Sequence, residues 1–198
     1  EAAPSGRWPV TFPQAEGQIP IYYNKKNTGR PTDHPVLIDQ IPVGAPQFSL
    51  GESSYWLEYG DKPLLPFGYG LTYTTFAYGA PVLSDTLMSD EMTVSCVIRN
   101  TGEREGVAVP QLYVRDLVGS LTRPVRELKG FQRVSIPAGD STTVVFTLTR
   151  DDLAYWHYAK GITLGADGGY ERSAEPGRFQ VWVAPNAAEG CPIEFRLR

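Results

Sequence analysis

The stretch MTVSCVIR (residues 92–99) decides the fold class, because its apolar side chains recur at every second position. Val94, Cys96 and Ile98 fall on one face, and the residues between them fall on the other. Successive side chains of a β-strand point to opposite faces of the sheet. The stretch therefore predicts a strand with one face in a hydrophobic core.

The same period recurs through the rest of the C-terminal two thirds of the chain, in segments 108–115, 142–148, 179–183 and 193–197. Turn sequences separate these segments, such as Asn100-Thr101-Gly102, where Asn and Gly tolerate a positive φ. Pro110 indicates an edge strand or a bulge, because proline cannot donate to a ladder. Together these patterns predict an all-β fold, an antiparallel β-sandwich.

Only one short segment of this part, residues 151–156, has a helical character. Asp151 and Asp152 at its start suit the positive end of a helix dipole. An acid/base pair is the weaker interpretation, because adjacent side chains point apart and cannot flank one glycosidic bond. We expect residues 159–173, which contain four glycines, to form a loop.

The first part of the chain has a different character. It is rich in Pro, Gly, Tyr and Asn and shows no sustained period, and the prolines between residues 28 and 46 prevent a regular helix or a central strand. The 198 residues suffice for one sizeable domain and a long extension. We therefore expect an extended N-terminal segment that lies over another surface.

The composition argues against several classes of partner and cofactor. The net charge of −4 comes with scattered basic residues, so neither nucleic acid nor an anionic membrane is an expected partner. No apolar run approaches the ~20 residues that cross a bilayer. Neither the two cysteines nor the two histidines, His34 and His157, have the spacing of a metal motif, so we expect no metal and no cofactor.

Four motifs follow one another along the chain: PSGRWPVTFP (residues 4–13), PFGYGLTYT (66–74), QLYVRD (111–116) and RPVRELKGF (123–131). In this order they resemble the C-terminal region of family 3 glycoside hydrolases of the β-glucosidase type, including its fibronectin type III-like domain. The resemblance covers nearly the whole chain. Residues 32–56 depart most from the family pattern, and they look like a variable insertion.

The resemblance implies three parts and a non-catalytic role. Residues 1–30 would be the tail end of the α/β sandwich domain of the parent enzyme, 31–71 an extended linker with the insertion, and 72–198 the fibronectin type III-like β-sandwich. Family members are retaining hydrolases that use two carboxylates. By resemblance both carboxylates lie on preceding domains, so this chain would stabilise the catalytic domains and shape the rim of their site.

The same resemblance implies partners and a compartment. The partners would be the barrel and α/β sandwich domains of the same enzyme, and a β-glucoside or oligosaccharide substrate would be met only through them. A periplasmic or secreted location is expected.

Aromatic residues of the first part are the candidates for a substrate rim, because flat rings can stack on sugar rings. The candidate residues are the aromatic Tyr22, Tyr23, Tyr55 and Trp56, together with the polar Asn27 and Arg30 of the same part of the chain. The alternative is that these rings hold the extended segment against neighbouring domains. We expect Tyr155, Trp156 and Trp182 to be core or inter-domain contacts. A second function, an independent carbohydrate-binding or adhesion module, would require an exposed row of aromatic residues on one sheet face.

Overall fold

The structure is a computed structural model that describes residues 4–27, 30, 32, 34–46, 53–159 and 169–198. Its elements are two 3-10 turns, η1 (Glu16–Gln18) and η2 (Ile38–Gln40), one short helix, α1 (Arg150–Leu153), and the strands β1 (Phe76–Tyr78), β2 (Val82–Leu83), β3 (Leu87–Met88), β4 (Glu91–Asn100), β5 (Gly106–Ala108), β6 (Gln111–Asp116), β7 (Glu127–Phe131), β8 (Val134–Ile136), β9 (Ser141–Thr149), β10 (Tyr155–Tyr158), β11 (Tyr170–Ser173), β12 (Gly177–Ala184) and β13 (Ile193–Leu197).

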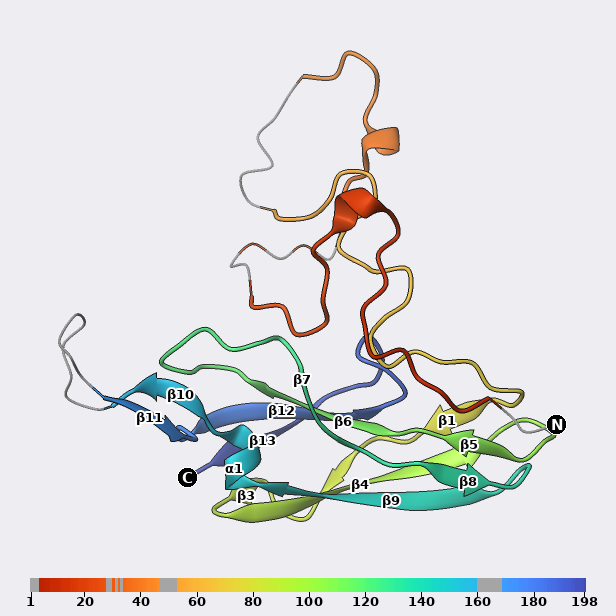
Figure 1. Cartoon of the computed structure of the whole chain (residues 1–198), viewed down its shortest axis with the longest axis vertical. Helices are drawn as coiled ribbons and strands as arrows, with labels where there is room; N and C mark the ends of the chain where they lie inside the picture. Colours follow the sequence, from red (N-terminus) through yellow and green to blue (C-terminus); the bar gives the residue numbers. More distant parts are fainter. Residues whose placement is uncertain (1–3, 28–29, 31, 33, 47–52, 160–168) are drawn as a thin grey trace.

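Two sheets form the layers of a β-sandwich (Figure 1). One sheet centres on β4, which pairs with β1, β2 and β9, and the other has the order β3-β13-β12-β6-β7. Two small sheets, β5-β8 and β10-β11, complete the fold. The predicted all-β sandwich is confirmed. One pairing departs from the antiparallel expectation, because β13 and β3 are parallel.

The core lies between the two layers, as the two-residue period predicts. Val94, Cys96 and Ile98 of β4 are all buried, and β9 runs antiparallel to β4 along its whole length. From the opposite sheet, Phe179 and Phe195 stack with ring centroids 5.3 Å apart. Burying a large apolar side chain contributes about 1.5–3 kcal/mol, so this layer of side chains dominates the stability of the fold.

Pro110 occupies a different place from the one that the sequence suggested. It lies between β5 and β6, which belong to different sheets, and β6 is an internal strand between β12 and β7. The predicted edge or bulge position was wrong. A proline that cannot continue the ladder ends β5 here, and the chain crosses to the other sheet. The irregularity in the β6–β7 register falls later, between Leu112 and Tyr113.

The turn after β4 is built on a buried amide and not on positive φ. Neither Asn100 nor Gly102 has a positive φ, so that part of the prediction was wrong. The Asn100 side chain donates to the carbonyls of Arg104 (2.7 Å) and Ile136 (2.9 Å) and accepts from the Thr74 hydroxyl and the Gly102 amide. Gly102 is needed because a Cβ there would lie 2.3 Å from Thr74 Oγ1.

The short helix α1 leads from β9 into β10 of the small β10–β11 sheet, and the helical character expected for residues 151–156 ends at Leu153, because Tyr155 begins β10. Thr149 and Asp152 form a reciprocal capping box, so Asp152 is a cap and not a catalytic acid. The expected loop over residues 159–173 is corrected at its end, because Tyr170–Ser173 is strand β11, paired with β10. Residues 160–168 of that expectation lie outside the described part of the chain.

We predict that Asn100→Ala lowers the free energy of unfolding by about 2–4 kcal/mol, because it leaves buried carbonyls without a donor. The measurement is urea unfolding followed by circular dichroism. Asn24→Ala, which removes the same amide from an exposed position, should change the free energy of unfolding by less than about 0.5 kcal/mol. Equal effects of the two substitutions would contradict the role given to Asn100.

Candidate functional site

The most unusual feature of the molecule is a long segment, residues 13–63, that leaves the sandwich and returns to it (Figure 1). We call it the projecting segment. Its base is closed by backbone hydrogen bonds: the Trp8 amide donates to Tyr69 O, the Gly68 amide to Trp8 O and the Phe12 amide to Leu65 O, each at 2.8 Å. The expected extended N-terminal segment is therefore present.

Polar contacts, and not a hydrophobic core, hold the projecting segment together. Gln18 has the one buried side chain among its described residues, and it accepts from the Gln14 amide (2.8 Å) and donates to Lys62 O (2.9 Å). The Tyr55 hydroxyl donates to Val36 O at 3.1 Å. None of the described residues of the segment belongs to the core cluster of the sandwich. Such a segment has little apolar burial to offset the entropy of its ordering.

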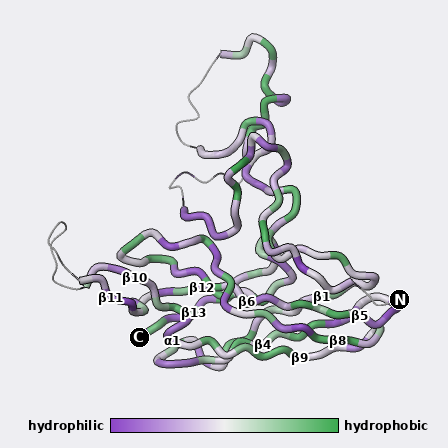
Figure 2. Tube along the Cα trace, viewed as in Figure 1, coloured by the Kyte–Doolittle hydropathy of each residue, from purple (hydrophilic) through white to green (hydrophobic). Residues whose placement is uncertain are grey.

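Large apolar side chains of the projecting segment face solvent instead. Figure 2 shows hydrophobic stretches along it, and the exposed residues are Ile19, Tyr22, Val36, Ile38, Ile41, Val43 and Tyr59. Single exposed apolar residues are common on protein surfaces, but a concentration of them marks an interaction site. This surface is suited to burial against another protein surface.

The projecting segment returns to the sandwich at Tyr23. The Tyr23 ring stacks on Phe67 with centroids 4.2 Å apart, and it meets the edge of Tyr113 at 5.9 Å. Its hydroxyl accepts a hydrogen bond from the Leu128 amide at 3.4 Å. We call this contact the Tyr23 anchor. It holds the segment against β6 and β7.

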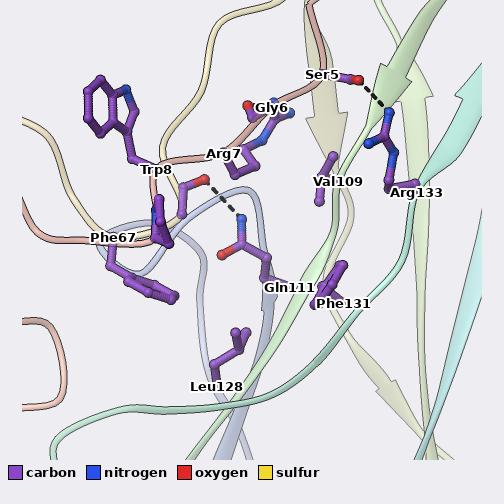
Figure 3. Close-up of a pocket in the computed structure, with 12 residues that line it drawn as sticks. Ser5, Gly6, Arg7, Trp8, Phe67, Val109, Gln111, Leu128, Phe131 and Arg133 are labelled. Carbon is purple, nitrogen blue, oxygen red and sulfur yellow. Dashed lines mark hydrogen bonds between the residues drawn. The ribbon is translucent and has the colours of Figure 1, made fainter.

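Below the anchor, one buried side chain joins the base of the segment to the sandwich. Gln111 donates to Gly68 O at 3.0 Å (Figure 3). It also donates to Pro185 O at 2.6 Å and accepts from the Tyr113 hydroxyl. Gly68 has a φ of +80°, and a Cβ there would lie 2.0 Å from Gln111 Oε1. Only glycine fits at that position, because both the backbone conformation and the space exclude a side chain.

The side chain of Arg126 packs beside Tyr113, next to the Gln111 contacts. The Arg126 guanidinium lies 4.4 Å from the Trp182 ring centroid and 5.7 Å from that of Tyr113, and it donates to Glu189 O at 2.9 Å. Burial lowers the pKa of Arg126, and burial raises the pKa of the Tyr113 hydroxyl. The raised pKa keeps Tyr113 protonated at neutral pH, so its hydroxyl remains a donor to Gln111.

A hollow of about 280 Å³ lies between the N-terminal residues and the sandwich (Figure 3). Its apolar walls are Trp8, Phe67, Val109, Leu128 and Phe131. At its rim, the Arg133 guanidinium donates to the Ser5 hydroxyl. Such a lining fits an apolar side chain from a neighbouring surface.

Comparison with known proteins agrees with the family resemblance found in the sequence motifs. Residues 108–187 match the Fibronectin type III-like domain family. Over 98% of its length the chain is 36% identical to the periplasmic beta-glucosidase of Salmonella typhimurium, and over 93% it is 34% identical to a beta-xylosidase of Formosa agariphila. This chain belongs to the C-terminal, fibronectin type III-like region of the family 3 glycoside hydrolases.

The region is only a part of each relative. It spans 23% of the Salmonella protein and 22% of the Formosa protein. The crystal structure of beta-glucosidase from Listeria innocua in complex with isofagomine matches it with a TM-score of 0.78 at 31% identity, over 99% of this chain and 25% of that one. In these relatives the region shares one chain with the rest of a longer protein. No helix in the described residues is long and apolar enough to cross a membrane.

Within this glycoside hydrolase region, the predicted rim residues do not gather at one place. Tyr23 is committed to the anchor, whereas the neighbouring Tyr22 is exposed. Asn27 lines a polar hollow of about 300 Å³ beside residues 115–123. These three side chains therefore face different surroundings.

The other three predicted rim residues are Arg30, Tyr55 and Trp56. Arg30 O accepts a hydrogen bond from the Ser54 amide at 2.9 Å, beside Tyr55. Trp56 is half-buried and pairs through its backbone with Gly60. The hydrogen bond from Ser54 places Arg30 beside the stretch that contains Tyr55.

Sequence reasoning missed the residues that receive the anchor: Phe67, Gln111, Tyr113 and Arg126. Each lies in or beside a motif that carries the family resemblance, and this was the available signal. Their partners are distant in sequence, so spacing alone could not pair them. The two histidines also have different settings: His34 is exposed, and His157 is buried with Nε2 2.8 Å from Ser173 Oγ. Among the described residues, no group of three His, Cys, Asp or Glu side chains could hold a metal ion.

We predict that Gly68→Ala destabilises the chain more than Gly139→Ala, by about 1–3 kcal/mol. The two glycines have nearly the same φ, +80° and +79°, but a Cβ at Gly139 meets nothing within 4 Å. The backbone strain is therefore matched, and the difference reports the collision with Gln111. Urea unfolding measures it, and equal losses of stability would show that the Gln111 contact is not rigid.

Proposed function

We propose that the protein to which this region belongs is a retaining hydrolase of terminal non-reducing β-D-glucosyl residues. In this proposal, the region is its non-catalytic part and docks the catalytic domains through the projecting segment. The observation that carries the proposal is the exposed apolar surface of that segment, which has no core of its own. The similarity of nearly the whole chain to a β-glucosidase supports the choice of enzyme.

The physical argument concerns the cost of ordering the segment. Fixing the backbone of each residue costs about 1–2 kcal/mol, and the polar contacts of Gln18 and Tyr55 each return only about 0.5–1.5 kcal/mol. Burial of the exposed side chains against a neighbouring domain would supply the free energy that offsets the rest of this ordering cost. Inter-domain contacts within a chain typically bury about 600–1,500 Å².

The chemistry is assigned to other domains. A retaining mechanism requires two carboxyl groups about 5–5.5 Å apart, one as nucleophile and one as acid/base. We place both on the barrel and α/β sandwich domains. Residues 1–30 would then complete the α/β sandwich domain, 31–71 would link it, and 72–198 would be the fibronectin type III-like domain.

The contribution of the region to the site is a rim. Tyr22, Asn27, Arg30, Tyr55 and Trp56 would contribute to this rim at separate points, with the aromatic rings stacking on sugar and the polar groups bonding its hydroxyls. Tyr23 would hold this rim at a fixed height above the sandwich. The location would be periplasmic or secreted, which the name of the Salmonella relative supports.

We predict that Val36→Thr lowers the free energy of unfolding of the full-length enzyme by about 1–2 kcal/mol but leaves that of the isolated 198-residue chain unchanged. The reason is that Val36 is exposed here and would become buried by docking, where a hydroxyl without a partner is costly. Thermal and urea unfolding of both proteins measure the effect.

Val145→Thr is the matched control. Val145 is 50% exposed and Val36 is 51% exposed, but Val145 lies on β9, on the layer that faces away from the projecting segment (Figure 1). It should have the same small effect in both proteins. If Val36→Thr also leaves the full-length enzyme unchanged, the projecting segment is not the docking surface.

A further inference from the structure

The β10–β11 hairpin presents a row of aromatic rings on one face. In its register Trp156 lies opposite Arg172, and Tyr158 lies opposite Tyr170. These four residues share a face, and the three rings are 63%, 39% and 61% exposed in the order Trp156, Tyr158, Tyr170. Tyr158 and Tyr170 are in contact, with centroids 5.0 Å apart. We call these three rings the aromatic stripe. Trp156 is therefore an exposed residue and not a core residue.

The opposite face of the hairpin is held firmly to the sandwich. Tyr155 and His157 are buried there, and the Tyr155 hydroxyl bonds to Glu175. The Arg123 guanidinium lies 4.0 Å from the Tyr155 ring centroid. His157 contacts Ser173 of the paired strand. The rings of the stripe consequently stand on a supported sheet and not on a loose loop.

The stripe also lies away from the surface assigned to docking. Figure 1 places β10 and β11 at one end of the sandwich, whereas the base of the projecting segment lies toward the other end. The surface proposed for docking therefore does not include the stripe.

The charges beside the stripe favour a neutral ligand. Arg172 is the only cation among the four residues of this face, and it is paired with Asp151, whose pKa the hydrogen bond from Arg172 lowers. The two charges cancel locally, so the face has no net attraction for an acidic or a basic partner. A hydrogen bond with Tyr158 raises the pKa of Tyr170, so the Tyr170 hydroxyl is neutral and adds no charge to this face.

The size of the stripe argues against a protein partner. Three rings of about 150–250 Å² each, only partly exposed, offer a few hundred Å², whereas a stable protein interface needs about 800 Å² per partner. A sugar ring requires only one aromatic face. In β-linked glucose all ring substituents are equatorial, so both faces of the ring present C–H groups that pack on an aromatic face.

We propose that the aromatic stripe binds a neutral β-linked glucan chain, with Trp156 stacking on one sugar ring and the Tyr158–Tyr170 pair on the next. Trp156 and Tyr158 lie two residues apart on the same face of β10, and this linear arrangement suits an extended β-glucan better than a coiled α-glucan. This site is separate from the rim of the proposed function and stands on the hairpin alone, so either can fail without the other.

The test is native electrophoresis of the 198-residue chain through gels that contain soluble mixed-linkage β-glucan, with glycogen gels as the α-linked comparison. The β-glucan should retard the chain and glycogen should not. Trp156→Ala and Tyr170→Ala should each weaken the dissociation constant by about tenfold, which is the loss of one ring contact. Because both side chains are exposed, the thermal unfolding of the variants should match that of the parent chain.

Trp8→Ala is the control, because Trp8 is also partly exposed but lies outside the stripe, at the hollow near the N-terminus. It should be retarded as strongly as the parent. Absence of retardation of the parent chain, equal retardation of Trp156→Ala, or equal retardation by glycogen would overturn the proposal. Self-association of the parent that Trp156→Ala abolishes would also overturn it, in favour of a second copy of the chain.

Discussion

The arrangement of the whole molecule depends on the buried amide of Gln111. It lies on an internal strand of the sandwich and donates to the carbonyls of Gly68 and Pro185, so it joins the base of the projecting segment to both the β6 and β12 sides of one sheet. The Tyr23 anchor rests directly on this junction through Phe67 and Tyr113. A buried polar group of this kind is costly unless fully bonded, and full bonding fixes one geometry. The direction in which the projecting segment leaves the sandwich follows from that geometry.

The sequence predicts the sandwich well because its signal is local. The alternation in β4 and β9 places apolar side chains on one face of each strand. Burying that face is favourable in free energy regardless of how the strands are connected. The absence of any period in the first part also predicts a segment without a core. Residues such as Thr149 and Asp152 are equally readable, since a capping box is complete within one helical turn.

The features that were missed depend on contacts between distant residues. The sequence predicts one strand through Pro110, and only the packed sheets show that β5 ends before it and that the chain crosses between layers there. Asn100 and Gly102 suggested positive φ, whereas the actual constraint is the approach of Thr74. Tyr155 and Trp156 point to opposite faces in any strand, so the alternation does not say which of them is buried. Tyr155 is the buried one because it contacts Glu175 and Arg123, and spacing in the sequence could not predict these contacts.

Two surfaces of unlike chemistry therefore lie at different places on one sandwich: an aliphatic-rich projecting segment suited to domain docking, and a charge-neutral aromatic stripe suited to sugar. The central claim is that the sandwich is stable alone while the projecting segment needs a neighbour. Amide hydrogen exchange of the isolated chain and of the full-length enzyme tests it most directly. We expect the amides of β4 and β9 to be protected in both proteins, and those of residues 34–46 to exchange at least about tenfold more slowly in the full-length enzyme. Equal exchange of residues 34–46 in the two proteins would contradict the account.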